Sequence, residues 1–215
     1  MTTIFIAFNK IAIGTAYFLF YAGSVFTGYV LGRIFFNEKL TSLKAASLLI
    51  GLIGLILIYS IGFESNKVWF YILANIAGIG SAIWNVFSKK ISQKYSTSQI
   101  VFVDSFLIAI LSLFFSLLVK EKFIFPAFTV PWISNILFAL SSLITSYLIV
   151  YGFKYVEASL GSMILLLEVL FGIFFSYLFF HETVSFGALF GGGLVILAIL
   201  LPNLSGKIFR KHGEL

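Results

Sequence analysis

Long apolar runs, separated by short polar gaps, make up most of this chain. A helix that crosses the hydrocarbon core of a bilayer needs about 20 apolar residues, because its backbone must satisfy its own hydrogen bonds there. Residues 1–8 are apolar but too short to cross, as if they were the last turns of another helix. The runs long enough to span predict seven helices: residues 12–36, 43–62, 67–88, 99–119, 130–152, 158–180 and 184–203. We therefore expect an all-α integral membrane protein, a seven-helix bundle.

The composition agrees with a lipid environment. Hydrophobic residues make up 60% of the 215 residues and charged residues 10%, against about 45–50% and about 25% in soluble domains. A soluble fold of this size could not bury so much apolar surface, so the lipid bilayer is the expected partner. The net charge of +6 comes from basic residues in the gaps between spans, where they orient membrane proteins. Nucleic acid is therefore not an expected partner.

The distribution of basic residues predicts the orientation. Cytoplasmic loops of membrane proteins carry an excess of Lys and Arg. Four basic residues fall on one side of the predicted spans: Lys10, Lys67, Lys120 and Lys122. Ten fall on the other side: Arg33, Lys39, Lys44, Lys89, Lys90, Lys94, Lys154, Lys207, Arg210 and Lys211. We predict a multi-pass protein of the cell membrane with a cytoplasmic C-terminus.

Two segments of the chain are similar to each other. Residues 25–41 (VFTGYVLGRIFFNEKLT) and 169–185 (VLFGIFFSYLFFHETVS) align with Glu38 on Glu182, an offset of 144 residues. Five further identities share this offset: Lys10 with Lys154, Val25 with Val169, Gly28 with Gly172, Phe35 with Phe179, and Phe36 with Phe180. An odd number of spans separates the copies, so they should point in opposite directions. Inverted repeats are typical of secondary transporters; chance similarity of two Phe-rich helices is the alternative.

Several short motifs resemble the EamA type of the drug/metabolite transporter superfamily. They are KYVEA at 154–158, LEV at 167–169 and FHETVS at 180–185, followed by a Gly-rich apolar helix. The resemblance implies ten helices in two inverted five-helix repeats, with both termini cytoplasmic. Val169 departs from the family pattern, which usually has Pro there, and Ser24 stands where the first repeat could carry the Glu.

The resemblance also implies a division of the chain. Residues 1–62 correspond to a partial first repeat, the end of one helix plus two spans. Residues 63–205 correspond to a complete second repeat of five spans, and 206–215 form a basic cytoplasmic tail. The first three helices of the family are then expected to be missing.

Glu168 is the acid nearest the centre of a predicted span. A charge there costs about 2.5–3.5 kcal/mol on insertion scales, so it should face the bundle and find a partner. It shares one helix face with Gly161, Gly172 and Ser176, a small and polar stripe. We expect a proton-coupling or substrate-binding carboxylate; a carboxyl group that holds helices together is the alternative.

Other polar positions are candidates for a substrate path. Asn75 and Asn85 share a face of one span, and Ser142 and Ser146 share a face of another. Such faces either line a hydrated cavity or join helices. Two further residues complete the set of candidate substrate contacts: Trp84 and Asp104. Trp84 could instead belong to the interfacial aromatic belt, and Asp104 could reach headgroup water.

Glu38 and Glu182 lie in turns on opposite sides of the membrane. Helix capping is their expected role, and gating is the alternative.

The sequence therefore predicts a secondary transporter of small organic solutes, by export or exchange through alternating access, coupled to protons or to a counter-substrate. It contains no Cys and no hydrolase or metal-site motif in a plausible context, so we predict neither enzymatic activity nor a metal or cofactor. The alternative is a non-transporting assembly subunit or a truncated, inactive fragment. Either reading allows a homodimer or a partner subunit that completes the bundle.

Overall fold

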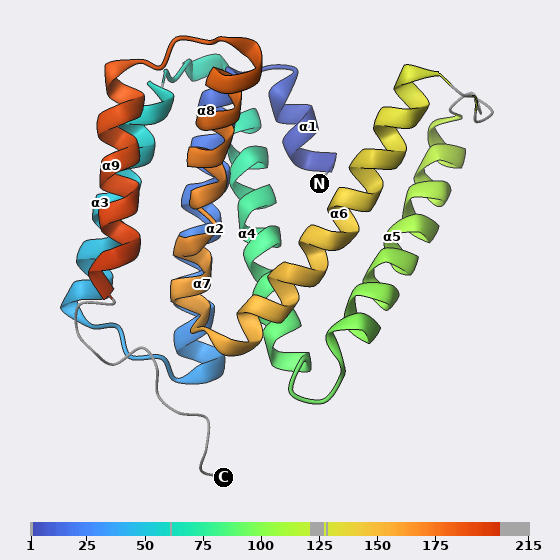
Figure 1. The fold of residues 1–215 in the computed structure, drawn as a ribbon, viewed down its shortest axis with the longest axis horizontal. Helices are drawn as coiled ribbons and strands as arrows, with labels where there is room; N and C mark the ends of the chain where they lie inside the picture. Colours follow the sequence, from blue (N-terminus) through green and yellow to red (C-terminus); the bar gives the residue numbers. More distant parts are fainter. Residues whose placement is uncertain (1, 61, 121–126, 128, 203–215) are drawn as a thin grey trace. The chain divides into compact units, whose positions relative to one another are not determined.

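A computed structural model describes residues 2–60, 62–120, 127 and 129–202, and the elements in these ranges are helices (Figure 1). Their bounds are α1 Thr2–Phe8, α2 Ile13–Phe36, α3 Ser42–Tyr59, α4 Val68–Ile91, α5 Thr97–Val119, α6 Val130–Tyr155, α7 Ala158–Ile164, α8 Leu167–Phe180 and α9 Phe186–Leu200, with a 3₁₀ turn at Ser65–Lys67. The predicted helical membrane bundle is thereby confirmed.

Six helical segments are long and apolar enough to cross a membrane, α7 and α8 being counted together. The seventh predicted span, 184–203, corresponds to α9, which is shorter, with 15 residues. The predicted tail at 206–215 lies outside the described residues.

The chain divides into two compact units. The first, here called the core unit, consists of the described parts of residues 1–86 and 156–215. The second, here called the hairpin unit, consists of the described parts of residues 87–155.

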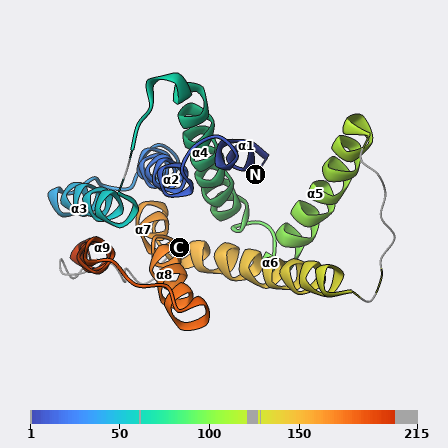
Figure 2. The same ribbon diagram turned by 90° about the horizontal axis from the view of Figure 1, so that it is seen from above.

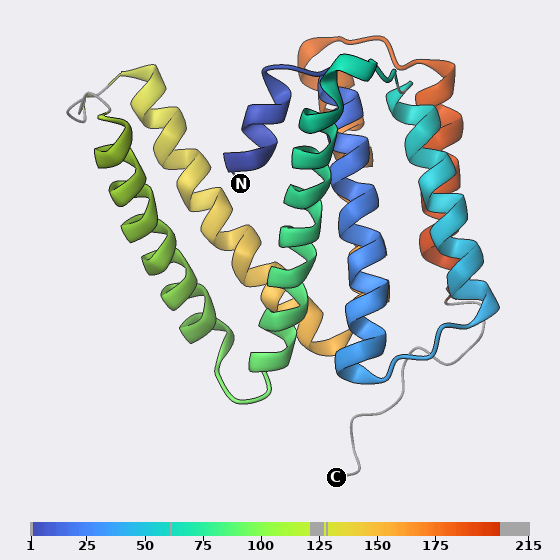
Figure 3. The same ribbon diagram turned by 180° about the vertical axis from the view of Figure 1, so that it is seen from behind.

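The core unit is centred on a close crossing of α3 and α9, which lie side by side and antiparallel (Figures 1, 2 and 3). A Cβ atom added to Gly54 would stand 2.7 Å from the carbonyl oxygen of Gly191. The Ser47 hydroxyl donates to the carbonyl of Ala198. Small residues allow membrane helices to approach this closely, because dispersion contacts and interhelical hydrogen bonds drive their association in lipid.

Beside this crossing, α2 packs against α7. Val25, Leu55 and Met163 are each no more than 1% exposed and belong to one apolar cluster. Many large apolar side chains elsewhere are exposed, for example Phe179 and Phe186. Such surface suits contact with acyl chains, which explains how a chain this apolar can leave much of its apolar surface uncovered by protein.

The predicted span 158–180 coincides with a segment long and apolar enough to cross a membrane, Ala158–Phe180, but its helix is interrupted rather than continuous. The break follows α7, and the N–H groups of Glu168 and Val169 donate to the carbonyls of Leu165 and Leu166 at 3.1 Å. These i to i−3 bonds tighten the chain as in a 3₁₀ turn. Glu168 consequently lies in the first turn of α8 rather than in mid-helix.

The two similar segments adopt the same backbone geometry. Asn37 ends α2 at φ 52°, and His181 ends α8 at φ 54°, both in the left-handed region. Thr41 then caps α3 by accepting the Lys44 N–H, and Ser185 caps α9 in the same way. The two connections lie at opposite ends of the core unit (Figures 1 and 3).

The hairpin unit is built on α5 and α6. A capping box of Ser96 and Gln99 begins α5. A groove of about 650 Å³ between the two helices is lined mainly by apolar side chains, including Phe102, Phe106 and Tyr147. Near the other end of α6, the Lys89 ammonium donates to the carbonyl of Phe153 at 3.2 Å.

Candidate functional site

A cavity of about 600 Å³ lies within the core unit. Its lining comes from the first half of α2, the end of α3, the whole length of α8 and the connection from α8 to α9. The cavity thus extends from Glu168 at the start of α8 to Glu182 just after its end. Of the residues that the sequence singled out as substrate contacts, Glu168 is the one in this lining.

Three tyrosines form an aromatic wall of this cavity. The Tyr17 ring stacks on Tyr21, with centroids 6.1 Å apart, and on Tyr59, with centroids 6.2 Å apart. Tyr21 and Tyr59 line the same cavity as the Glu168 carboxylate. A carboxylate therefore sits beside a continuous surface of π faces.

The ionisable lining residues other than tyrosine are both acidic, Glu168 and Glu182, and the lining contains no Lys, Arg or His. Hydroxyl groups of Ser176, Thr183 and Ser185 add hydrogen-bonding capacity. A cleft with low-dielectric walls that is lined by charges of one sign focuses their field. The cavity is consequently electronegative.

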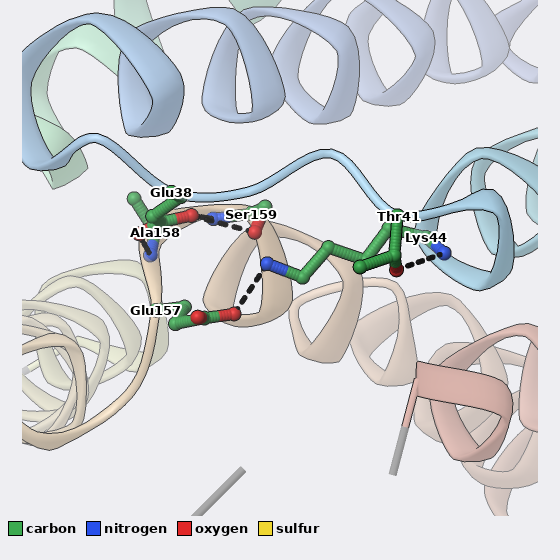
Figure 4. Close-up of polar contacts among 6 residues, drawn as sticks. All are labelled: Glu38, Thr41, Lys44, Glu157, Ala158 and Ser159. Atoms are coloured by element: carbon green, nitrogen blue, oxygen red, sulfur yellow. Dashed lines mark hydrogen bonds and ion pairs between the residues drawn. The ribbon is translucent and has the colours of Figure 1, made fainter. Parts of the chain in front are cut away.

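The opposite end of the core unit is closed by Glu38 (Figure 4). Its carboxylate accepts the N–H of Ala158 at 2.5 Å, the N–H of Ser159 at 3.1 Å and the Ser159 hydroxyl at 2.6 Å. Glu38 is 5% exposed. These bonds satisfy orphan N–H groups at the start of α7 and place a negative charge at the positive end of the helix. The capping role expected for Glu38 is found, but the helix it caps is 120 residues away.

An ion pair between α3 and the residue before α7 lies beside these hydrogen bonds. The Lys44 ammonium lies 2.5 Å from a carboxylate oxygen of Glu157, the residue before α7 (Figure 4). The Lys44 side chain is 9% exposed, against 43% for Glu157. The cation is thus largely removed from solvent, while its partner is not.

Two glycines at equivalent positions of the repeat differ sharply between the ends. A Cβ atom on Gly28 would stand 2.7 Å from the Cβ of Ser162 on α7, so α2 and α7 are in tight contact there. Gly172 on α8 lines the cavity, and a Cβ atom added to it would meet nothing within 4 Å. The packing that closes one end is therefore absent at the other.

Three other candidates from the sequence lie on α4. The Asn75 amide donates to the carbonyl of Leu19 at 3.1 Å, and a Cβ atom on Gly23 would stand 2.8 Å from the Asn75 carbonyl oxygen. Asn75 therefore joins α4 to α2. Asn85 is 2% exposed, and its side-chain oxygen accepts no hydrogen bond from the described residues. Trp84 is half-buried. None of the three lines the cavity that contains Glu168.

The remaining three candidates belong to the hairpin unit. Ser142 and Ser146 lie on α6, one turn apart, and Asp104 lies on α5; all three are half-buried. A substrate path that includes them, or the α4 residues, remains a prediction.

Sequence reasoning missed the aromatic wall. Tyr17 and Tyr21 are four residues apart on α2 and so share a face, which was a usable signal. Tyr59 comes from the end of α3, and no spacing along the chain connects it to them. The chain also has 27 Phe and 10 Tyr, so the sequence alone does not distinguish these three tyrosines from aromatic residues that face lipid.

Comparison with known proteins agrees with this architecture. A solved structure titled "Crystal structure of protein" is similar in fold, with a TM-score of 0.78 over 95% of this chain and 73% of that chain, at 18% sequence identity. No curated protein matched the sequence. The family model of the EamA-like transporters matches residues 68–204, which is more than half of the chain. The chain therefore belongs to the EamA-like transporter family, whose members are membrane transporters of the drug/metabolite type.

Proposed function

We propose that this protein is a secondary transporter of small organic solutes that works by alternating access, by export or exchange. The observation that carries the proposal is the contrast between the ends of the core unit. The Glu168 cavity extends to the α8–α9 connection, whereas Glu38 and Lys44 tie α7 to the α2–α3 connection. A solute site accessible from one side is the arrangement that alternating access requires.

The orientation follows from the basic residues. With the excess of Lys and Arg in the cytoplasm, the Glu38 end of the core unit faces the cytoplasm and the cavity opens to the outside. The C-terminus is then cytoplasmic, in the cell membrane.

The two helix pairs α2–α3 and α8–α9 are the inverted parts of the two repeats. The shared caps at an offset of 144 residues support this division, with 1–62 as the partial first repeat and 63–205 as the second. Two similar pairs of opposite direction give the protein two ends that can close in the same way.

The cavity chemistry favours a protonated amine or another organic cation as substrate. A carboxylate supplies a counter-charge at Glu168, and the Tyr17, Tyr21 and Tyr59 rings supply cation–π contacts. A basic group would be needed to balance an anionic solute, and the lining has none. Glu168 is accordingly the substrate-binding carboxylate, and release of the solute on its protonation would couple transport to protons.

Reconstitution tests this proposal. Proteoliposomes should take up radiolabelled organic amines, and matched carboxylates of similar size should be taken up at least tenfold less. Glu168→Gln should lower amine uptake at least tenfold and remove its dependence on pH. Glu64→Gln is the matched control, because Glu64 pairs with Lys67 in a connection outside the cavity, and it should retain uptake. Unchanged pH-dependent uptake in Glu168→Gln would exclude the coupling role.

A further inference from the structure

The residues that form the contact between Glu38 and α7 have equivalents elsewhere in the core unit. The aligned segments place Glu182 at the position equivalent to Glu38, and Gly14 and Thr15 at those of Ala158 and Ser159, all at the offset of 144 residues. Thr15, like Ser159, carries a hydroxyl in the first turn of its helix. The three groups that bind Glu38 at one end therefore have equivalents of the same chemistry at the other.

The connection that carries Glu182 has the same backbone geometry as the one that carries Glu38. The N–H of Glu38 donates to the carbonyl of Gly32 at 3.3 Å, and the N–H of Glu182 donates to that of Ser176 at 3.4 Å. Each Glu follows a left-handed residue and precedes the same kind of hydroxyl cap. The backbone at Glu182 therefore matches the backbone at Glu38.

The first turn of α2 has no side-chain cap, and Thr15 in it is 1% exposed, so such a contact would replace the packing that now covers Thr15. Its N-cap residue, Ala12, supplies no side-chain hydrogen bond to the orphan N–H groups of the helix. The Thr15 hydroxyl donates to the carbonyl of Gly62 at 3.4 Å, a long contact. An incoming carboxylate would satisfy these N–H groups and meet the positive end of a 24-residue helix.

Glu182 and Gly14 both line the Glu168 cavity, so closing the cavity would bring them together. Gly172, the equivalent of Gly28, faces open space on the same cavity and has room for this approach.

We propose that Glu182 and the first turn of α2, with Thr15, form a second gate contact that replaces the Glu38–α7 contact when the transporter changes state. This inference rests on the proposed alternating access and names its two gates. Glu38 holds the state seen in the structure, with the cavity open at the α8–α9 end. Glu182 holds the opposite state, with that end closed.

A cysteine probe in the cavity tests the exchange, and the chain contains no native Cys to interfere. Ser176→Cys replaces a hydroxyl of the cavity lining with a thiol of similar size, so it adds no bulk that closure would have to accommodate. Its labelling by a membrane-impermeant maleimide, added to right-side-out vesicles, reports whether the α8–α9 end is open. In this background Glu38→Gln should lower the labelling rate at least threefold, because the opposite state gains population. Ser159→Ala should lower it in the same direction, and this milder change guards against misfolding of Glu38→Gln.

The decisive step is the double variant. Adding Glu182→Gln to Glu38→Gln should restore the labelling rate to within twofold of the starting protein, because both gates are then lost. Thr15→Ala should also raise it in the Glu38→Gln background, whereas Thr15→Ser, which keeps the hydroxyl, should not. Labelling that stays low after Glu182→Gln, or that never falls after Glu38→Gln and Ser159→Ala, overturns the second gate. Because labelling needs no substrate, a failure of uptake in proteoliposomes would count against the proposed transport alone.

Discussion

The hydroxyl of Ser47 on α3 donates a hydrogen bond to the carbonyl oxygen of Ala198 on α9. Moving each residue by 144 positions gives Gly191 and Gly54, and these two face each other at the same crossing. The offset of 144 residues therefore converts the Ser47–Ala198 contact into the Gly191–Gly54 contact. Contacts related in this way are arranged as around a local two-fold axis. We interpret the α3–α9 crossing as the packing centre of the core unit.

The crossing should tolerate no added volume. Gly54→Ala would place a Cβ 2.7 Å from the Gly191 carbonyl oxygen, and overpacking of this kind costs about 1–3 kcal/mol. We expect a melting temperature in detergent lower by roughly 2–4 °C per kcal/mol. A Cβ atom added to Gly193 on α9, the helix that carries Gly191, meets nothing within 4 Å. Gly193→Ala should therefore have the melting temperature of the starting protein. Equal melting of both variants would contradict the close crossing.

The equivalent glycines Gly28 and Gly172 should respond differently to the same change. Gly28→Ala crowds Ser162 and should destabilise the folded protein by about 1–3 kcal/mol. Gly172→Ala meets open space and should change stability by less than about 0.5 kcal/mol. Thermal unfolding followed by circular dichroism measures both. A larger loss in Gly172→Ala would show that its end of the core unit is already packed.

Removing one partner of the Lys44–Glu157 ion pair should cost more stability than removing the other. Glu157→Gln leaves a largely buried ammonium without its partner, and we expect a loss of about 1–2 kcal/mol, reduced from that of a fully buried pair because Glu157 is 43% exposed. Lys44→Met leaves a half-exposed carboxylate and should cost less. A double-mutant cycle measures the coupling. The exposed Lys67–Glu64 pair is the control, and its cycle should give less than about 0.5 kcal/mol.

The aromatic wall should contribute to amine binding through its π faces. Tyr17→Leu removes the ring that stacks on both Tyr21 and Tyr59, and a desolvated cation–π contact is worth about 1–2 kcal/mol. We expect the KM for amine uptake to rise about five- to thirtyfold. Tyr17→Phe keeps the ring and should stay within about twofold. If Tyr17→Phe is as impaired as Tyr17→Leu, the hydroxyl and not the ring is the contact.

The helical membrane class could be predicted from the sequence because it depends on local properties of the chain. Span length and the absence of polar residues are set by the thickness of hydrocarbon and by the backbone's need for internal hydrogen bonds. The aligned turns were readable for a similar reason, since Asn37 and His181 end their helices in the left-handed region that Asn and His tolerate better than most residues.

Other features were decided by packing between distant segments. The helix breaks before Glu168 although Val169 stands where the family usually has proline. The sequence therefore contained no helix-breaking residue that predicted this break. Tyr59 joins Tyr17 and Tyr21 only because α3 returns beside the start of α2.

By itself, the sequence determined that this chain forms membrane helices with two similar, oppositely directed pairs, and it singled out Glu168 as an acid inside a span. Only the tertiary structure decided that the Glu38 carboxylate accepts hydrogen bonds from α7, whereas among the described residues the Glu182 carboxylate has no equivalent bond to α2. The repeat makes the two ends alike in residues. Their difference is one of conformation. Equivalent residues stand at both ends, so the sequence pattern alone does not say which end has formed the contacts.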